Sequence, residues 1–241
     1  MNNYIVLFMG EMQRHIKYHI LSASLFVAAL WIGVLFFSDI EDVTGLSPLL
    51  VFIDITSMAI LTVGVSMFFE KQEGVIKTMF VTPITKIEYI MSKNISSVVV
   101  NVIGMVVLYL YANYFRELNI NFWGFLGGIL LITYFHSLLG FVLTYSSKDF
   151  TDLLMGSFKY ILIFMVPVML DHIGLITNNI LQGVMYLLPT KAAMTLILSS
   201  AGGVENWEIW YGIGYMLFGS LVLQYAVNKK FQEFAAKESG V

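Results

Sequence analysis

The sequence contains no cysteine and few charged residues. Without cysteine among its 241 residues, the chain can form neither a disulfide framework nor a thiolate metal site. Lys, Arg, Asp and Glu make up 12% of the residues, whereas 58% are hydrophobic and the mean hydropathy is +0.80. A soluble domain of this length carries roughly twice that charged fraction. The composition therefore predicts a polytopic membrane protein.

Common catalytic signatures are also missing. The residues after Gly74 read Val-Ile-Lys-Thr, without the second glycine and the spacing of a Gly-x-x-x-x-Gly-Lys-Ser/Thr phosphate loop. The sequence has neither a His-Glu-x-x-His zinc motif nor a Gly-x-Ser-x-Gly elbow. We therefore expect no catalytic residues, no bound metal or cofactor, and no ATP hydrolysis by this chain alone.

Six apolar runs each approach the roughly 20 residues that a helix needs to cross a bilayer. They cover residues 18–37, 48–69, 95–114, 122–145, 153–170 and 207–227. The fifth run is the least regular, because it contains Lys159 and Pro167. Residues 3–17 carry an apolar stripe opposite a charged face and predict an interfacial helix on the inner leaflet, with a plain tail as the alternative. The predicted fold is an all-α integral membrane protein of one domain, residues 1–241.

Positive charges lie almost entirely on one side of these spans. Of the 13 Lys and Arg residues, only Arg116 and Lys191 fall on the other side. Because Lys and Arg accumulate in cytoplasmic segments, we expect a multi-pass plasma-membrane protein with both termini in the cytoplasm.

Residues 171–206 are too apolar for an ordinary outer loop. The stretch is interrupted by Asn178-Asn179, Pro189 and Gly202-Gly203. We expect two short re-entrant helices, about residues 174–187 and 190–199, which enter the outer leaflet without crossing. The alternative is a seventh span, which would place the lysines of the C-terminal tail outside.

Residues 70–93 form the longest charged segment of this apolar chain, and we call them the hairpin. Apolar residues at helical spacing predict a short amphipathic helix over residues 72–80, which Pro83 ends. Thr85 followed by Glu88 is a capping box and predicts that the next helix begins there. The hairpin would therefore join the second and third spans on the cytoplasmic side.

The hairpin resembles the intracellular coupling segment of type-2 ATP-binding-cassette permeases, the branch that includes drug, peptide and polysaccharide exporters. The residues that carry the resemblance are Glu70, Glu73-Gly74, Lys77, Thr82-Pro83, Glu88-Tyr89 and Lys93. It implies that the segment docks on an ATPase subunit through Glu70, Glu73, Gly74, Val75, Ile76, Lys77, Met79, Phe80 and Pro83. In this family a glutamate at the end of the second span contacts the connecting helix or the ATPase, and Glu70 and Glu73 are the matching positions.

The resemblance also implies the partners and the cargo. Two cytoplasmic ATPase subunits would carry ATP and Mg²⁺, and a second permease chain, identical or a paralogue, would complete a dimer in a bacterial membrane. No nucleic acid is expected, and membrane lipid surrounds the complex. Because the chain lacks a sizeable outer domain, we expect export of a hydrophobic or amphipathic drug or an antimicrobial or toxin peptide rather than a polysaccharide.

The resemblance further implies a substrate path between two permeases, lined by the first, second and fifth spans, and the candidate residues there are Asp54, Met58, Phe164 and Met165. Asp54 is the one carboxylate well inside a predicted span, which suggests a pathway or a partner, unless the span starts later and leaves it in water. His136 could carry protons or could simply pack against a neighbouring helix. The alternative function is therefore an ion-gradient-driven secondary transporter or channel that uses Asp54 and His136.

Glycines are frequent in the fourth and sixth predicted spans. Gly124 and Gly128 form a small-xxx-small pair, with Gly127 and Gly140 nearby. Such positions allow helices to approach closely, and they predict a tight bundle or a dimer contact.

Overall fold

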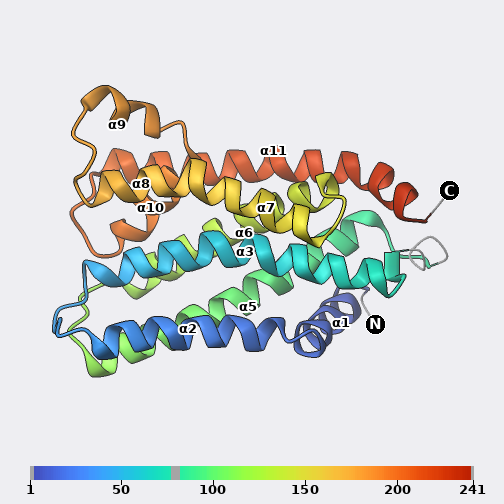
Figure 1. Cartoon of the computed structure of the whole chain (residues 1–241), viewed down its shortest axis with the longest axis horizontal. Helices are drawn as coiled ribbons and strands as arrows, with labels where there is room; N and C mark the ends of the chain where they lie inside the picture. Colours follow the sequence, from blue (N-terminus) through green and yellow to red (C-terminus); the bar gives the residue numbers. More distant parts are fainter. Residues whose placement is uncertain (1–2, 77–81, 240–241) are drawn as a thin grey trace.

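The computed structural model describes residues 3–76 and 82–239, and these residues form a helical bundle (Figure 1). The helices are α1 (Asn3–Lys17), α2 (Ile20–Phe37), α3 (Leu46–Gln72), α5 (Lys86–Phe115), α6 (Phe122–Ser146), α7 (Phe150–Tyr160), η1 (Ile161–Met165), α8 (Val166–His172), α9 (Asn179–Met185), α10 (Pro189–Ser199) and α11 (Asn206–Ser239). The described residues contain no β-strand beyond one isolated bridge between Asp42 and Glu117. The all-α prediction is confirmed.

The long helices lie side by side along the long axis of the molecule (Figure 1). Helix α3 packs against α6, α6 against α11, and α2 against α5. In the membrane-length part of α3, 67% of the residues are buried, against 22% for α2 and for the α7–α8 segment. Helix α3 is therefore central, whereas α2 and α7–α8 lie at exposed edges.

Five described helices are long and apolar enough to cross a membrane: α2, α3, α5, α6 and the continuous α7–η1–α8 segment, Phe150–His172. They match the first five predicted spans, so the chain is a multi-pass membrane protein. The sixth predicted span lies within α11, which is 34 residues long and runs beside α6 (Figure 1). The spanning of the membrane by α11 remains a prediction.

Both termini lie at the same end of the bundle as the hairpin, and we call it the hairpin end (Figure 1). Helices α9 and α10 lie at the opposite end and meet at an angle of 91°. Because the chain begins and ends at one end, it runs along the bundle an even number of times. This arrangement agrees with a re-entrant segment over residues 171–206 and not with a seventh span.

The fifth span contains a π-helical turn, η1, directly before Pro167. Proline has no N–H to donate and therefore interrupts the helical hydrogen bonds of the preceding turn. The hydroxyl of Thr190 on α10 donates to the backbone oxygen of Phe164. Helix α10 therefore supports the irregular turn, as the membrane interior requires of exposed backbone groups.

The two cations predicted on the outer side both have partners within the chain. Arg116 donates to the backbone oxygens of Leu35, Phe36 and Ser38 at 2.7–3.1 Å and so caps the C-terminus of α2. Lys191 Nζ lies 2.7 Å from Asp171 Oδ2 and joins α10 to α8.

Glycine allows the closest helix contacts within the chain. A Cβ atom at Gly140 would lie 2.7 Å from the backbone oxygen of Ile60, so α6 and α3 meet there at backbone distance. A Cβ atom at Gly128 would lie 3.4 Å from the oxygen of Leu196, whereas one at Gly124 would meet only its own cap residue. Gly128 and Gly140 therefore support the tight bundle.

Candidate functional site

Four charged side chains meet at the hairpin end, and we call Glu11, Arg14, Glu70 and Lys93 the charged cluster. Lys93 Nζ on α5 lies 2.7 Å from Glu11 Oε2 and 2.8 Å from Glu70 Oε1, and it also donates to Ser66 Oγ at 2.9 Å. Arg14 Nη1 on α1 lies 2.9 Å from Glu70 Oε1. The cluster therefore joins α1, α3 and α5.

Three members of the charged cluster are buried, Arg14 is 28% exposed, and the four charges balance. The side chains of Glu70 and Lys93 are 0% exposed, and that of Glu11 is 1% exposed. Removing charges from water costs several kcal/mol per ion, so such groups are tolerated only with close partners. Two carboxylates face two cations, and Tyr89 donates to the second oxygen of Glu70 at 2.6 Å. The ion pairs among these residues fix the relative position of α1, α3 and α5.

A second, more exposed contact lies beside the cluster. Glu73 accepts hydrogen bonds from Lys17 Nζ and Tyr18 Oη, each at 2.7 Å. These bonds lower the pKa of Glu73 below its usual range. The Tyr18 ring also stacks on Phe69 with centroids 4.8 Å apart. The end of α1 is therefore attached to the end of α3 at two points.

The predicted docking residues of the hairpin fall into different environments. Glu70 and Ile76 are buried within the chain and hold the hairpin instead of offering a surface, whereas Pro83 is exposed. Gly74 has a φ of 70°, the left-handed conformation that suits glycine after a helix end. The predicted contacts Lys77, Met79 and Phe80 lie outside the described residues.

The capping box predicted at the start of α5 is confirmed. The Thr85 side chain accepts from the backbone N–H of Glu88, and the Glu88 carboxylate accepts from the backbone N–H of Thr85 at 2.8 Å. Glu70 and Glu73 both bind residues at the end of α1. That a glutamate at the end of the second span contacts the connecting helix or the ATPase stays a prediction.

The four residues predicted to line a substrate path have different contacts within the chain. Asp54 on α3 accepts a hydrogen bond from Trp31 of α2 at 3.4 Å, whereas Met165 in η1 accepts one from Thr56 at 3.1 Å. Met58 lines a cavity of about 180 Å³ between α2 and α3. Phe164 stacks on Tyr160 within its own helix, with centroids 5.1 Å apart.

Asp54 is 3% exposed and follows the first two turns of a helix that begins at Leu46. Asp54 is therefore shielded from water within the chain, whereas its depth in the membrane stays a prediction. His136 is also buried; its Nε2 lies 3.0 Å from Tyr160 Oη, and its Nδ1 lies 2.8 Å from the oxygen of Ile132. These bonds fit the packed-histidine interpretation. The bonds of Asp54 and His136 lead to different helices.

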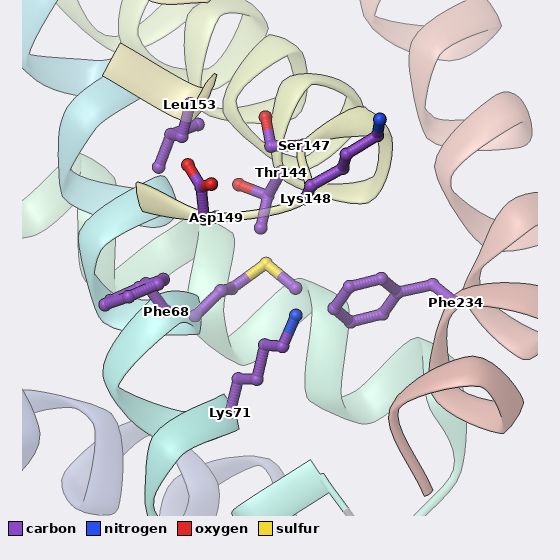
Figure 2. A pocket seen from close by; sticks show the side chains of 9 residues that line it. Phe68, Lys71, Thr144, Ser147, Lys148, Asp149, Leu153 and Phe234 are labelled. Atoms are coloured by element: carbon purple, nitrogen blue, oxygen red, sulfur yellow. The ribbon is translucent and has the colours of Figure 1, made fainter. Parts of the chain in front are cut away.

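A small pocket lies at the hairpin end between α3, the end of α6 and α11 (Figure 2). Lys71, Lys148 and Asp149 surround it together with Phe68 and Phe234 (Figure 2). Its volume of about 20 Å³ is enough for a single water molecule. The pocket is too small for a drug-sized ligand. Within residues 3–76 and 82–239, no group of three or more His, Asp or Glu could hold a metal ion.

Sequence reasoning did not predict the roles of Glu11 and Lys93. Charges beside a membrane usually lie in water, so nothing near them in the sequence indicated that these two side chains meet in the interior. The spacing contained a usable signal: Ser66 and Glu70 on one helix, and Tyr89 and Lys93 on the next, each lie four residues apart and therefore on one face.

Comparison with known proteins identifies the family of this chain. The sequence matches the model of the fluoroquinolones export permease protein family over residues 4–239. The chain belongs to this family. It is 25% identical over 233 residues to a fluoroquinolones export permease protein of Mycobacterium tuberculosis strain H37Rv, and equally to that of strain CDC 1551 / Oshkosh. The matches cover 96% of this chain and 95% of each relative. The chain is thus a membrane transport permease.

The buried histidine His15, at the hairpin end of this permease, makes stability depend on pH. His15 on α1 is buried, with its Nε2 3.1 Å from Ser96 Oγ. Burial, reinforced by the positive charge of Lys93, lowers the pKa of His15 from 6.5 to about 4. The unfolded chain therefore takes up a proton before the folded chain does. Stability should be constant above pH 6.5 and fall as the pH decreases from 6.5 to 4, by of the order of 3 kcal/mol.

The measurement is thermal unfolding of the detergent-solubilised protein as a function of pH. Since carboxylates also titrate near pH 4, His15→Gln should show a smaller loss between pH 6.5 and 4 than the unmodified chain. The control is His19→Gln, because His19 is exposed. Equal pH dependence in all three proteins would contradict the assignment.

Proposed function

We propose that this chain is the permease subunit of an ATP-driven exporter in a bacterial plasma membrane, with the hairpin and both termini in the cytoplasm. Two ATP-binding-cassette ATPase subunits would carry ATP and Mg²⁺, and a second permease chain, identical or a paralogue, would complete the complex. The observation that carries this proposal is the charged cluster, which fixes α1 and the two helices joined by the hairpin as one unit.

The geometry supports a lever. Glu70 lies at the end of α3 and Lys93 near the start of α5, so a displacement of the hairpin moves both helices together. Through Glu11 and Arg14 the same displacement reaches α1, which continues into α2 across His19. A force applied by an ATPase to one short segment would therefore move α2, α3 and α5 in concert. Rigid movement of packed helices is a common means of switching between conformations.

We propose fluoroquinolones, which are planar amphipathic drugs, as the substrate class. The family model and both mycobacterial relatives are named for fluoroquinolone export. The cavity beside Met58 has a largely apolar lining, which suits an aromatic ring system. The peptide cargo considered from sequence has less support, because the relatives are named for a drug.

The ion-gradient alternative has less support as well. It requires a relay between Asp54 and His136, but Asp54 binds Trp31 on α2 and His136 binds Tyr160 on α7. The described hydrogen bonds thus provide no shared path between the two groups.

The test is transport into inside-out vesicles that contain the permease and a co-expressed ATPase subunit. A fluorescent fluoroquinolone should accumulate on addition of ATP and Mg²⁺, and a protonophore should leave its uptake unchanged. A variant ATPase that cannot hydrolyse ATP should abolish the uptake. Uptake that persists without the ATPase and collapses with the proton gradient would reject the proposal in favour of the secondary transporter.

Phe80→Asp tests the coupling role of the hairpin. The sequence places Phe80 on the apolar face of the predicted amphipathic helix, so a charge there should abolish co-purification of the ATPase, with membrane insertion unchanged. The control is Phe115→Asp, since Phe115 is 72% exposed at the opposite end of the bundle. A complex retained by Phe80→Asp would contradict docking at the hairpin. Charge reversal at Glu73 is a poorer test, because Glu73 binds Lys17 and Tyr18 within the chain.

A further inference from the structure

A row of buried polar side chains runs from the charged cluster into the middle of the bundle. Asn94, Ser97 and Asn101 lie on one face of α5, because they are spaced three and four residues apart. They are joined by polar residues of the two neighbouring helices. We call these residues the polar seam: Thr62 on α3, Asn94, Ser97 and Asn101 on α5, and Thr133 and Ser137 on α6.

The seam residues are fully buried or nearly so, and some of them bind one another. Asn101 Nδ2 donates to the backbone oxygen of Ser97 at 2.8 Å and lies 3.5 Å from Thr62 Oγ1. Ser137 Oγ lies 3.3 Å from Ser97 Oγ and donates to the backbone oxygen of Thr133 at 2.6 Å. The seam therefore lies where α3, α5 and α6 meet.

Four polar atoms of the seam have no hydrogen-bond partner in the described part of the chain. They are Asn94 Oδ1, Asn94 Nδ2, Asn101 Oδ1 and Thr133 Oγ1. Exchanging the oxygen and nitrogen of Asn94 would not help, because both atoms are unpaired. The bond from Asn101 Nδ2 to Ser97 fixes the orientation of the second amide. Since buried polar groups are almost always hydrogen-bonded, a ligand within the seam must satisfy these atoms.

We propose that the polar seam binds ordered water molecules between α3, α5 and α6. The ligand must both donate and accept, because the unpaired set includes one amide donor, two carbonyl oxygens and one hydroxyl. A cation would satisfy only the oxygens. The seam has no carboxylate of its own, and Lys93 is adjacent to Asn94 in the chain. Water is the small molecule that meets all four requirements.

The seam is continuous with the charged cluster at one end and adjoins apolar side chains at the other, and Thr62 also lines the cavity beside Met58. Lys93 Nζ donates to Ser66 Oγ, which lies one turn from Thr62 on α3. Beyond Asn101, the buried side chains of Met105 and Leu108 are apolar. The row of buried polar side chains therefore reaches the hairpin end and does not continue along α5 beyond Asn101.

The experiment is water-edited solid-state NMR on the full-length chain in lipid bilayers, with ¹⁵N-labelled asparagine. Signals of the Asn94 and Asn101 amides are assigned by their disappearance in Asn94→Leu and Asn101→Leu. Asn113 is exposed on the same helix and serves as the solvent reference. We expect magnetisation from water to reach both seam amides with build-up times within about threefold of that for Asn113. Asn101 lies about 10 Å beyond Asn94 along α5. A water signal at Asn101 therefore comes from water in the seam and not from exchanging protons of the Lys93 ammonium group.

Thermal unfolding provides the second readout. Asn94→Leu and Thr133→Val keep the side-chain volume but remove the proposed water contacts, so each should lower Tm by several degrees, whereas Asn113→Leu should not. If the amide of Asn94 were dry and unpaired, its replacement by leucine would raise Tm or leave it unchanged. Two results would overturn the proposal. One is that no magnetisation from water reaches Asn94 by the time the Asn113 signal has reached its plateau. The other is an unchanged or raised Tm of Asn94→Leu and Thr133→Val.

Discussion

Replacing Lys93 with methionine is expected to lower the free energy of unfolding by about 3–5 kcal/mol. Methionine retains much of the volume of the side chain but leaves Glu11 and Glu70 buried with one cation, Arg14, in place of two. Loss of one member of a buried ion pair costs far more than the pair contributes, because the remaining charge stays out of water. The measurement is reversible unfolding in SDS and detergent mixtures.

Two controls separate this effect from a general loss of lysine. Lys230→Met removes an exposed lysine of α11 and should change the free energy of unfolding by less than about 0.5 kcal/mol. The double variant Glu70→Gln and Lys93→Met leaves Glu11 and Arg14 as a balanced pair, so it should recover part of the loss. A single Lys93→Met variant as stable as the unmodified chain would show that the cluster is not buried as described.

Gly140→Leu is the second change with a large expected effect. The backbone oxygen of Ile60 lies 2.7 Å from the position of a Cβ atom at Gly140, so any side chain there forces α6 away from α3. Backbone cannot move aside as a flexible side chain can, so we expect a loss of stability at the upper end of the usual range for overpacking, about 3 kcal/mol. The measurement is the same SDS unfolding titration, with the fraction of protein inserted in the membrane determined in parallel.

Gly127→Leu is the matched control, because a Cβ atom at Gly127 on the same helix would meet nothing within 4 Å. Leucine has a higher helix propensity than glycine, so this variant should be as stable as the unmodified chain or more stable. A similar stability of the two variants would contradict the close approach of α3 and α6.

Local patterns predicted most of the fold. Apolar runs of membrane length gave the first five spans, and Thr85 with Glu88 gave the start of α5, because both signals lie within one helix. The bend between α9 and α10 lies directly before Pro189, one of the interruptions of residues 171–206. The resemblance to coupling segments also led to Glu70, whose contact with α1 the structure contains.

The candidate site was less predictable, because it depends on contacts between distant parts of the chain. Lys93 lies in a stretch of lysines that would normally be solvated, and nothing near it in sequence indicates that Glu11 covers it. Ile76 belongs to an apolar face that could serve a partner as well as the core, and the structure places it in the core. Periodicity identifies an apolar face but not what covers it.

The large sequence separation between the residues of the charged cluster has a consequence for biogenesis. Glu11 and Lys93 are 82 residues apart, and Arg14 and Glu70 are 56 apart. During synthesis Glu11 and Arg14 can pair with each other at once, but their partners Lys93 and Glu70 emerge much later, so until then the two side chains remain in water or among lipid headgroups. The ribosome has to complete two spans and the intervening turn before this segment can settle, so its attachment is a late event in the maturation of the nascent chain.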